Sequence, residues 1–144
     1  MVKLYMNSDE SKELLDWIFK AEEHEKFARS ILTHKDAPAW GVAFFSQQMA
    51  ELSLKGLQLF HGKKLIKTHD LIELKNSLAD DEPELLTFQN DFKLLNGYYI
   101  ENRYPGDYPE IAWPEAEQAL SAALRIKDFV INKIEKKRHK IIGH

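Results

Sequence analysis

Apolar residues recur along most of the chain at intervals of three and four, the spacing that places them on one face of an α-helix. The first such pattern predicts a helix from residue 8 or 9 to about residue 32, with acidic residues in its first turn. The opposite face is charged, and we expect it to meet solvent. The expected buried face consists of Leu14, Trp17, Ile18, Ala21, Ala28, Ile31 and Leu32.

A second helix is predicted over residues 39–61, after a break at residues 35–38 that contains a proline. Gly62 follows it, and glycine commonly ends helices. Apolar residues occupy most of the circumference of this helix. We therefore expect it to be enclosed by the other helices or by a second subunit.

The polar residues of the second helix form one narrow stripe. Gln47, Glu51 and Lys55 are four residues apart and stack on successive turns, with Gln48 beside them. Glu51 and Lys55 have the favourable order for an ion pair within a helix. Because buried polar groups need partners, the stripe is expected to bond to a neighbouring loop, with Arg103 as one option.

Three shorter patterns follow. Thr68 is the predicted N-cap of a third helix and Asp70 lies in its first turn, before the apolar residues Leu71, Leu74 and Leu78.

A fourth helix is predicted to begin at Pro83 and to bury Leu85, Phe88, Phe92, Leu95 and Tyr99. Residues 102–114 hold three prolines and one glycine, which indicates an ordered loop, and a last helix opens at Pro114.

These patterns predict an all-α fold, an up-and-down antiparallel bundle of four to five helices. The chain of 144 residues is interpreted as one domain, residues 1–144, with a core at about residues 9–138 and a short basic C-terminal tail. The apolar second helix and the many aromatic residues favour a symmetric homodimer.

Composition narrows the function classes. The chain has no cysteine, so a disulfide or a thiolate metal site is impossible and the cytoplasm is the expected compartment. The net charge of −3 argues against a generally cationic nucleic-acid binder, and the apolar run at residues 40–45 is far shorter than a membrane span. His24 and Glu25 begin like a zinc-protease motif, but Ala28 stands where the second histidine belongs. We expect a soluble protein with no metal and no cofactor.

Three segments together resemble the HEPN domain, the higher eukaryote and prokaryote nucleotide-binding family. They are residues 44–55 (FFSQQMAELSLK), residues 68–71 (THDL) and residues 98–106 (YYIENRYPG). Trp17 and Ala21 also stand where that family usually begins. The resemblance covers roughly residues 10–135. It implies a helical bundle, frequently dimeric, similar to the domain that accompanies minimal nucleotidyltransferases.

The family contains metal-independent ribonucleases whose motif is an arginine followed, after four to six residues, by a histidine. Histidine and arginine suit that chemistry, because it needs a proton acceptor and a cation beside the phosphate. After Arg103 this spacing falls on Tyr108, Pro109 and Glu110, so the histidine is absent. Two other arginine–histidine pairs remain possible for this chemistry. One is Arg138 with the terminal His144, and the other is Arg103 with His69, if the fold brings these two residues close together.

Other members bind nucleotides or protein partners without catalysis, and we assign the chain to this class. The predicted nucleotide- or partner-binding residues are Arg103, Tyr104, Lys55, His69, Tyr99 and Gln48. The predicted supporting residues are Glu51, Gln47, Thr68, Asp70 and Asp107. The alternatives are a toxin-like endoribonuclease that acts on RNA and a dimeric scaffold without a small ligand. The expected partners are a nucleotide, a nucleotidyltransferase-type protein as in toxin-antitoxin pairs, and a second copy of the chain, with no membrane.

Overall fold

The computed structural model of the chain describes residues 8–101 and 103–141, with the backbone path alone at residue 8 and residues 137–141. These residues form an all-α bundle with no strand in the described part, which confirms the predicted fold class. The five α-helices and two 3₁₀ helices are α1 (Ser8–His34), α2 (Ala39–Phe60), α3 (Leu71–Leu78), η1 (Pro83–Phe88), α4 (Gln89–Asn96), η2 (Pro105–Asp107) and α5 (Trp113–Ile141).

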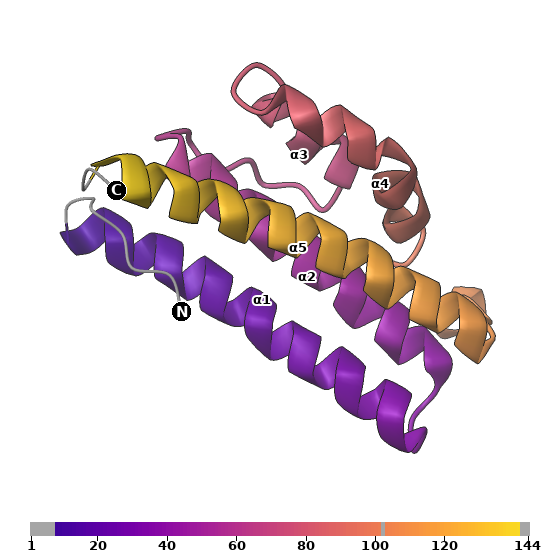
Figure 1. The fold of residues 1–144 in the computed structure, drawn as a ribbon. Helices are drawn as coiled ribbons and strands as arrows, with labels where there is room; N and C mark the ends of the chain where they lie inside the picture. The colour runs from indigo at the N-terminus through magenta and orange to yellow at the C-terminus, as the bar shows by residue number, and fades with distance from the viewer. Residues whose placement is uncertain (1–7, 102, 142–144) are drawn as a thin grey trace.

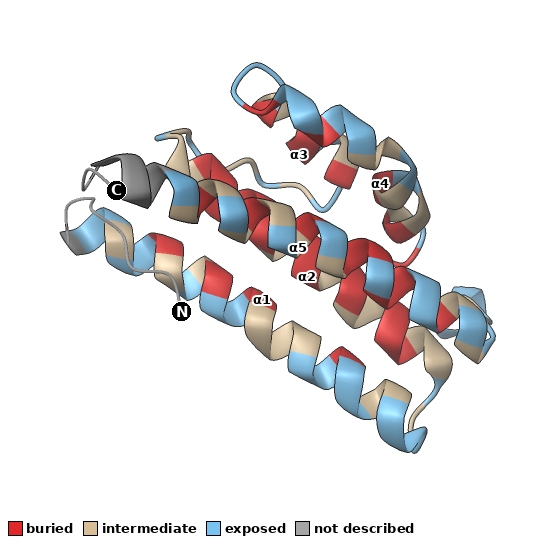
Figure 2. Ribbon diagram, viewed as in Figure 1, coloured by how far each residue is buried: buried red, intermediate tan, exposed pale blue. Residues whose placement is uncertain are grey.

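The second helix, α2, lies at the centre of the bundle. It packs mainly between α1 and α5, and α3 and α4 also contact it. Figure 1 shows that α2 runs antiparallel to α1, that α4 leads the chain back, and that α5 then runs in the same direction as α2. Fourteen of its 22 residues are buried, so the predicted enclosure of α2 is confirmed within a single chain (Figure 2).

Two predicted helix starts are corrected by the structure. Thr68 is not the N-cap of α3; Asp70 is, and its side chain accepts from the N–H groups of Ile72 and Glu73. The α-helical part of the fourth element does not begin at Pro83. Residues 83–88 form the 3₁₀ helix η1, which suits a short stretch at a helix start, and α4 follows.

The end of α4 also differs from the sequence prediction. The helix stops at Asn96, so Tyr99 lies beyond it. Gly97 is the C-cap, and at this end the Asn96 side chain bonds to the start of α3: its oxygen accepts from the Leu71 N–H at 2.8 Å and its nitrogen donates to Asp70 at 2.8 Å. Gly62 ends α2 as predicted, with a positive φ of 68° that few other residues adopt.

None of the described helices is long and apolar enough to cross a membrane.

Candidate functional site

The buried carboxylate of Glu51 is the centre of the polar stripe on α2. The residue is 4% exposed, and both of its oxygens are bonded. Oε2 accepts from the Lys55 ammonium at 3.0 Å, and Oε1 lies 2.9 Å from Nδ1 of His69. A charged group at this depth is stable only with partners, and the pairing with Lys55 and His69 provides them.

The two glutamines extend this network to the backbone. The Gln47 amide donates to the carbonyl oxygen of His69 at 3.1 Å and, more weakly, to Glu51 at 3.4 Å. Gln48 in turn donates to the Gln47 oxygen at 2.6 Å. The loop that α2 holds is therefore the one before α3, and His69 is bound by both its ring and its backbone.

The His69 ring reaches the surface from this buried support. Its side chain is 46% exposed and stacks on Tyr99, with the ring centroids 4.1 Å apart and the planes at 16°. Because a carboxylate only accepts hydrogen bonds, the contact with Glu51 places a proton on Nδ1. The opposite nitrogen, Nε2, is then the atom that His69 offers to a ligand.

Tyr99 connects this histidine to the loop after α4. Its hydroxyl donates to Oε2 of Glu101 at 3.0 Å. Burial, followed by the hydrogen bond to Glu101, raises the pKa of Tyr99 to about 12. Tyr99 is therefore a neutral hydrogen-bond donor at neutral pH, and its ring stays against His69.

Arg103 closes the loop of residues 97–108. Its guanidinium donates to the carbonyl oxygen of Gly97 at 2.8 Å and to that of Asp107 at 3.3 Å. This corrects one expectation: Glu51 bonds to His69, and neither it nor Lys55 forms a hydrogen bond with Arg103. Arg103 itself is exposed, and beside it Tyr104 is 80% exposed.

Lys55 does not reach this surface. The residue is 8% exposed, and its ammonium lies between Glu51 and the ring of Trp17 on α1, 5.8 Å from the ring centroid. The structure therefore places Lys55 as an internal partner of Glu51 and not as a ligand-binding cation.

The structure places His69, in the loop before α3, against the loop after α4 that holds Arg103, and no hydrogen bond joins the two side chains. Tyr99 stacks on His69, and two residues earlier Gly97 binds Arg103. Of the other predicted arginine-histidine pair, the Arg138 side chain and His144 lie outside the described residues.

Asp70 fixes the segment that presents His69. Its backbone N–H donates to the Thr68 hydroxyl at 3.1 Å, so Thr68 supports the turn without capping the helix. The hydrogen bond from the Asn96 amide is the main cause that lowers the pKa of Asp70 below its ordinary value of 3.8. The hydrogen bonds from the N–H groups of Ile72 and Glu73 lower this pKa further.

Replacement of Asp70 by alanine is expected to lower the free energy of unfolding by about 1 kcal/mol, the usual cost of an N-cap. Folding lowers the pKa of the Asp70 carboxyl, so the ionised carboxylate stabilises the folded chain. This stabilisation is complete above about pH 4, near the ordinary pKa of 3.8, and it is lost as the pH falls through the lowered pKa. Urea unfolding of the native chain and Asp70→Ala at pH 7 and pH 3 checks this. The stability difference should shrink between pH 7 and pH 3, and a constant difference would contradict it.

An aromatic pocket of about 450 Å³ adjoins the same loop. It lies between the end of α1, the start of α2 and the segment after α4. Sequence reasoning missed it, because only the fold brings the two parts of its wall together. The lining residues are Ile31, Ala37, Pro38, Trp40, Gly41, Phe44, Phe45, Ile100, Glu101 and Tyr108.

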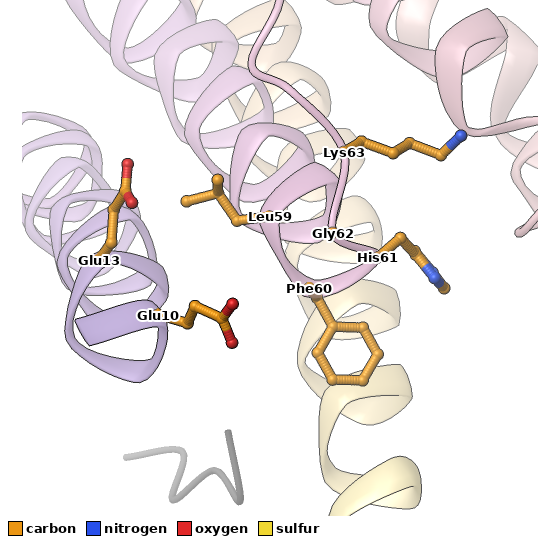
Figure 3. Close-up of a pocket in the computed structure, with 7 residues that line it drawn as sticks. All are labelled: Glu10, Glu13, Leu59, Phe60, His61, Gly62 and Lys63. Atoms are coloured by element: carbon orange, nitrogen blue, oxygen red, sulfur yellow. The ribbon is translucent and has the colours of Figure 1, made fainter. Parts of the chain in front are cut away.

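A second pocket, of about 470 Å³, lies at the other end of α2 and is a poor candidate. Figure 3 shows two α1 glutamates on one side, while His61 and Lys63 extend away from them. His61 pairs with Glu82 at 2.8 Å and Lys63 with Asp81 at 2.9 Å. These two basic groups therefore tie α2 to the turn before η1. The lining residues are Glu10, Glu13, Leu59, Phe60, His61, Gly62 and Lys63.

Comparisons with known proteins agree with this fold. The family model of the HEPN domain matches residues 14–137. The crystal structure of TT1696 from Thermus thermophilus is similar, with a TM-score of 0.72 and 33% sequence identity over 83% of this chain and 97% of that one. No curated protein matches the chain. Because the family model spans most of the sequence, this chain belongs to the HEPN domain family.

Proposed function

We propose that this HEPN domain binds a nucleotide at the surface that His69, Tyr99 and Arg103 share. The observation that carries the proposal is the support of His69: a buried carboxylate holds Nδ1 at 2.9 Å, and a half-exposed ring remains for a ligand. A histidine whose Nδ1 is bonded to a buried carboxylate has one tautomer and one ring orientation. Its ring is therefore preorganised for binding a ligand.

The chemistry of the surface fits a phosphate and a base. The Arg103 guanidinium has five N–H donors, and its two bonds to carbonyl oxygens leave others for phosphate. The exposed ring of Tyr104 and the stacked pair of His69 and Tyr99 offer flat faces of the kind on which bases stack. Lys55 is left out of the proposed site because it is buried.

We further propose two protein partners, a nucleotidyltransferase-type protein and a second copy of this chain. Support for the first comes from membership of the HEPN family, whose domains accompany minimal nucleotidyltransferases. The second is supported by exposed aromatic side chains on α1, Phe19 and Phe27, which are 49% and 51% exposed. Light scattering of the purified chain tests the dimer.

Arg103→Ala is expected to weaken the binding of nucleoside monophosphates by roughly 10- to 100-fold, since a hydrogen bond to a charged group contributes about 1.5–3 kcal/mol. Calorimetric titration of the native chain and the variant measures this. Arg29→Ala removes an equal charge from α1, where Arg29 pairs with Glu25, and should leave affinity unchanged. Equal affinities for Arg103→Ala and the native chain would overturn the proposed phosphate contact.

The second candidate function is metal-independent cleavage of RNA, and the same histidine favours it. With its proton fixed on Nδ1, His69 presents Nε2 as an acceptor for a 2′-hydroxyl proton. Incubation of the native chain and His69→Gln with mixed RNA and EDTA tests this candidate. Cleavage by the native chain alone would support it, whereas intact RNA in both would remove it.

A further inference from the structure

The aromatic pocket beside the candidate site has the shape and lining of a small-molecule site. Its volume of about 450 Å³ falls within the range of ligand pockets, and its wall is mostly apolar. Trp40 and Tyr108 meet edge to face, with centroids 5.1 Å apart and planes at 74°. Both rings, with that of Phe44, are only partly buried, so they present surface to an occupant.

One charged residue lines this pocket, and it is exposed. The Glu101 carboxylate accepts from Tyr99 through Oε2, and among the described residues Oε1 has no partner. A carboxylate accepts and never donates, so it selects a ligand whose edge carries N–H donors. It also disfavours a ligand that places negative charge or carbonyl oxygens at that edge.

The pocket and the proposed phosphate site are linked by residues of the loop after α4. Glu101 lines the pocket and binds Tyr99, which stacks on His69. On the other side Tyr108 follows Asp107, whose carbonyl oxygen binds Arg103. The loop of residues 97–108 therefore contributes both to the aromatic pocket and to the surface that carries the exposed guanidinium.

We propose that this pocket binds the base of the nucleotide and that Glu101 selects guanine. The inference rests on the proposed nucleotide binding and adds the identity of the base. Guanine carries two adjacent donors, N1–H and the 2-amino group, which match the two oxygens of a carboxylate, and Oε2 keeps a second lone pair beside its bond from Tyr99. Adenine and cytosine offer an amino group beside an acceptor nitrogen. Uracil offers one N–H between two carbonyl oxygens, which the carboxylate repels.

Calorimetric titration with GMP, AMP, CMP, UMP and guanosine tests the inference. For the native chain we expect GMP to bind at least tenfold more tightly than UMP, with AMP and CMP between them. Glu101→Gln should reduce the preference for GMP over UMP to less than threefold. Trp40→Leu should weaken all four nucleotides by about tenfold through lost stacking. Leu86→Ala, which truncates an exposed apolar residue of η1, is the control and should bind like the native chain.

The outcomes separate this inference from the proposed function. Tight binding of all four nucleotides with equal affinity, unchanged in Glu101→Gln and Trp40→Leu, would overturn the base pocket and leave nucleotide binding intact. Guanosine that binds as tightly as GMP, with dependence on Trp40 but not on Arg103, would support the pocket and overturn the phosphate contact. No binding of any nucleotide or of guanosine would overturn both. Glu101→Gln alters an exposed side chain, so its result does not depend on the core.

Discussion

Replacement of Glu51 by alanine is expected to lower the free energy of unfolding by about 3–5 kcal/mol, a large part of the stability of a domain of this size. The substitution leaves the Lys55 ammonium inside the bundle without its anion, 8% exposed and beside Trp17. It also removes the bond to Nδ1 of His69, so the histidine loses its fixed orientation. Chemical denaturation of the native chain and the variant measures the change.

A double substitution separates the loss of the ion pair from the loss of packing. Glu51→Leu with Lys55→Met removes both charges and keeps apolar volume, and buried ion pairs replaced in this way often lose little stability. The double variant should therefore be more stable than Glu51→Ala, although His69 is free to reorient in both. A cost below about 1 kcal/mol for Glu51→Ala, or a double variant that is less stable, would contradict the role assigned to this pair.

Phe92→Ala is expected to cost about 3–5 kcal/mol, the usual loss for a fully buried aromatic side chain. Phe92 has no exposed surface and is the largest of the fully buried side chains of α4. A helix of eight residues is not stable alone, so α4 depends on this packing and on the bidentate pair of Arg125 with Asp91. Equilibrium unfolding in guanidinium chloride measures the change.

The neighbouring Phe88 is the control for this prediction. It is half-buried and meets Phe129 edge to face at 5.3 Å, so Phe88→Ala should cost clearly less than Phe92→Ala. The loop of residues 97–108 follows α4 directly, and we expect its amide hydrogen exchange to accelerate in Phe92→Ala. Unchanged global stability in Phe92→Ala, with faster exchange confined to α4, would show that α4 unfolds on its own and would contradict the prediction.

Local spacing was enough to predict the polar stripe and the enclosed second helix. Gln47, Glu51 and Lys55 are one turn apart, and that geometry depends on the helix alone. Local sequence was not enough to predict which residue caps the N-terminus of α3. Thr68 and Asp70 are both good capping residues, and Asp70 takes the position in a structure where it also bonds to Asn96, 26 residues further along the chain.

Most of the candidate site depends on contacts between distant segments. Glu51 meets a histidine 18 residues away, and that histidine stacks on Tyr99, another 30 residues along the chain. Trp40 and Glu101 line one pocket although 61 residues separate them. The spacing of apolar and polar residues along the chain does not predict contacts between residues so far apart. The sequence motifs identified the family and several site residues, but not which of them touch.

The sequence by itself determined the all-α class, the approximate positions of the long helices, the absence of cysteine chemistry and the membership of the HEPN family. These properties follow from short-range patterns of apolar and polar residues and from motifs that lie within single segments. The tertiary structure alone decided that Lys55 is internal, that Glu51 supports His69 and not Arg103, and that an aromatic pocket adjoins the loop of residues 97–108. The physical reason is that burial and hydrogen-bond partners are set by how helices pack, which local spacing does not specify.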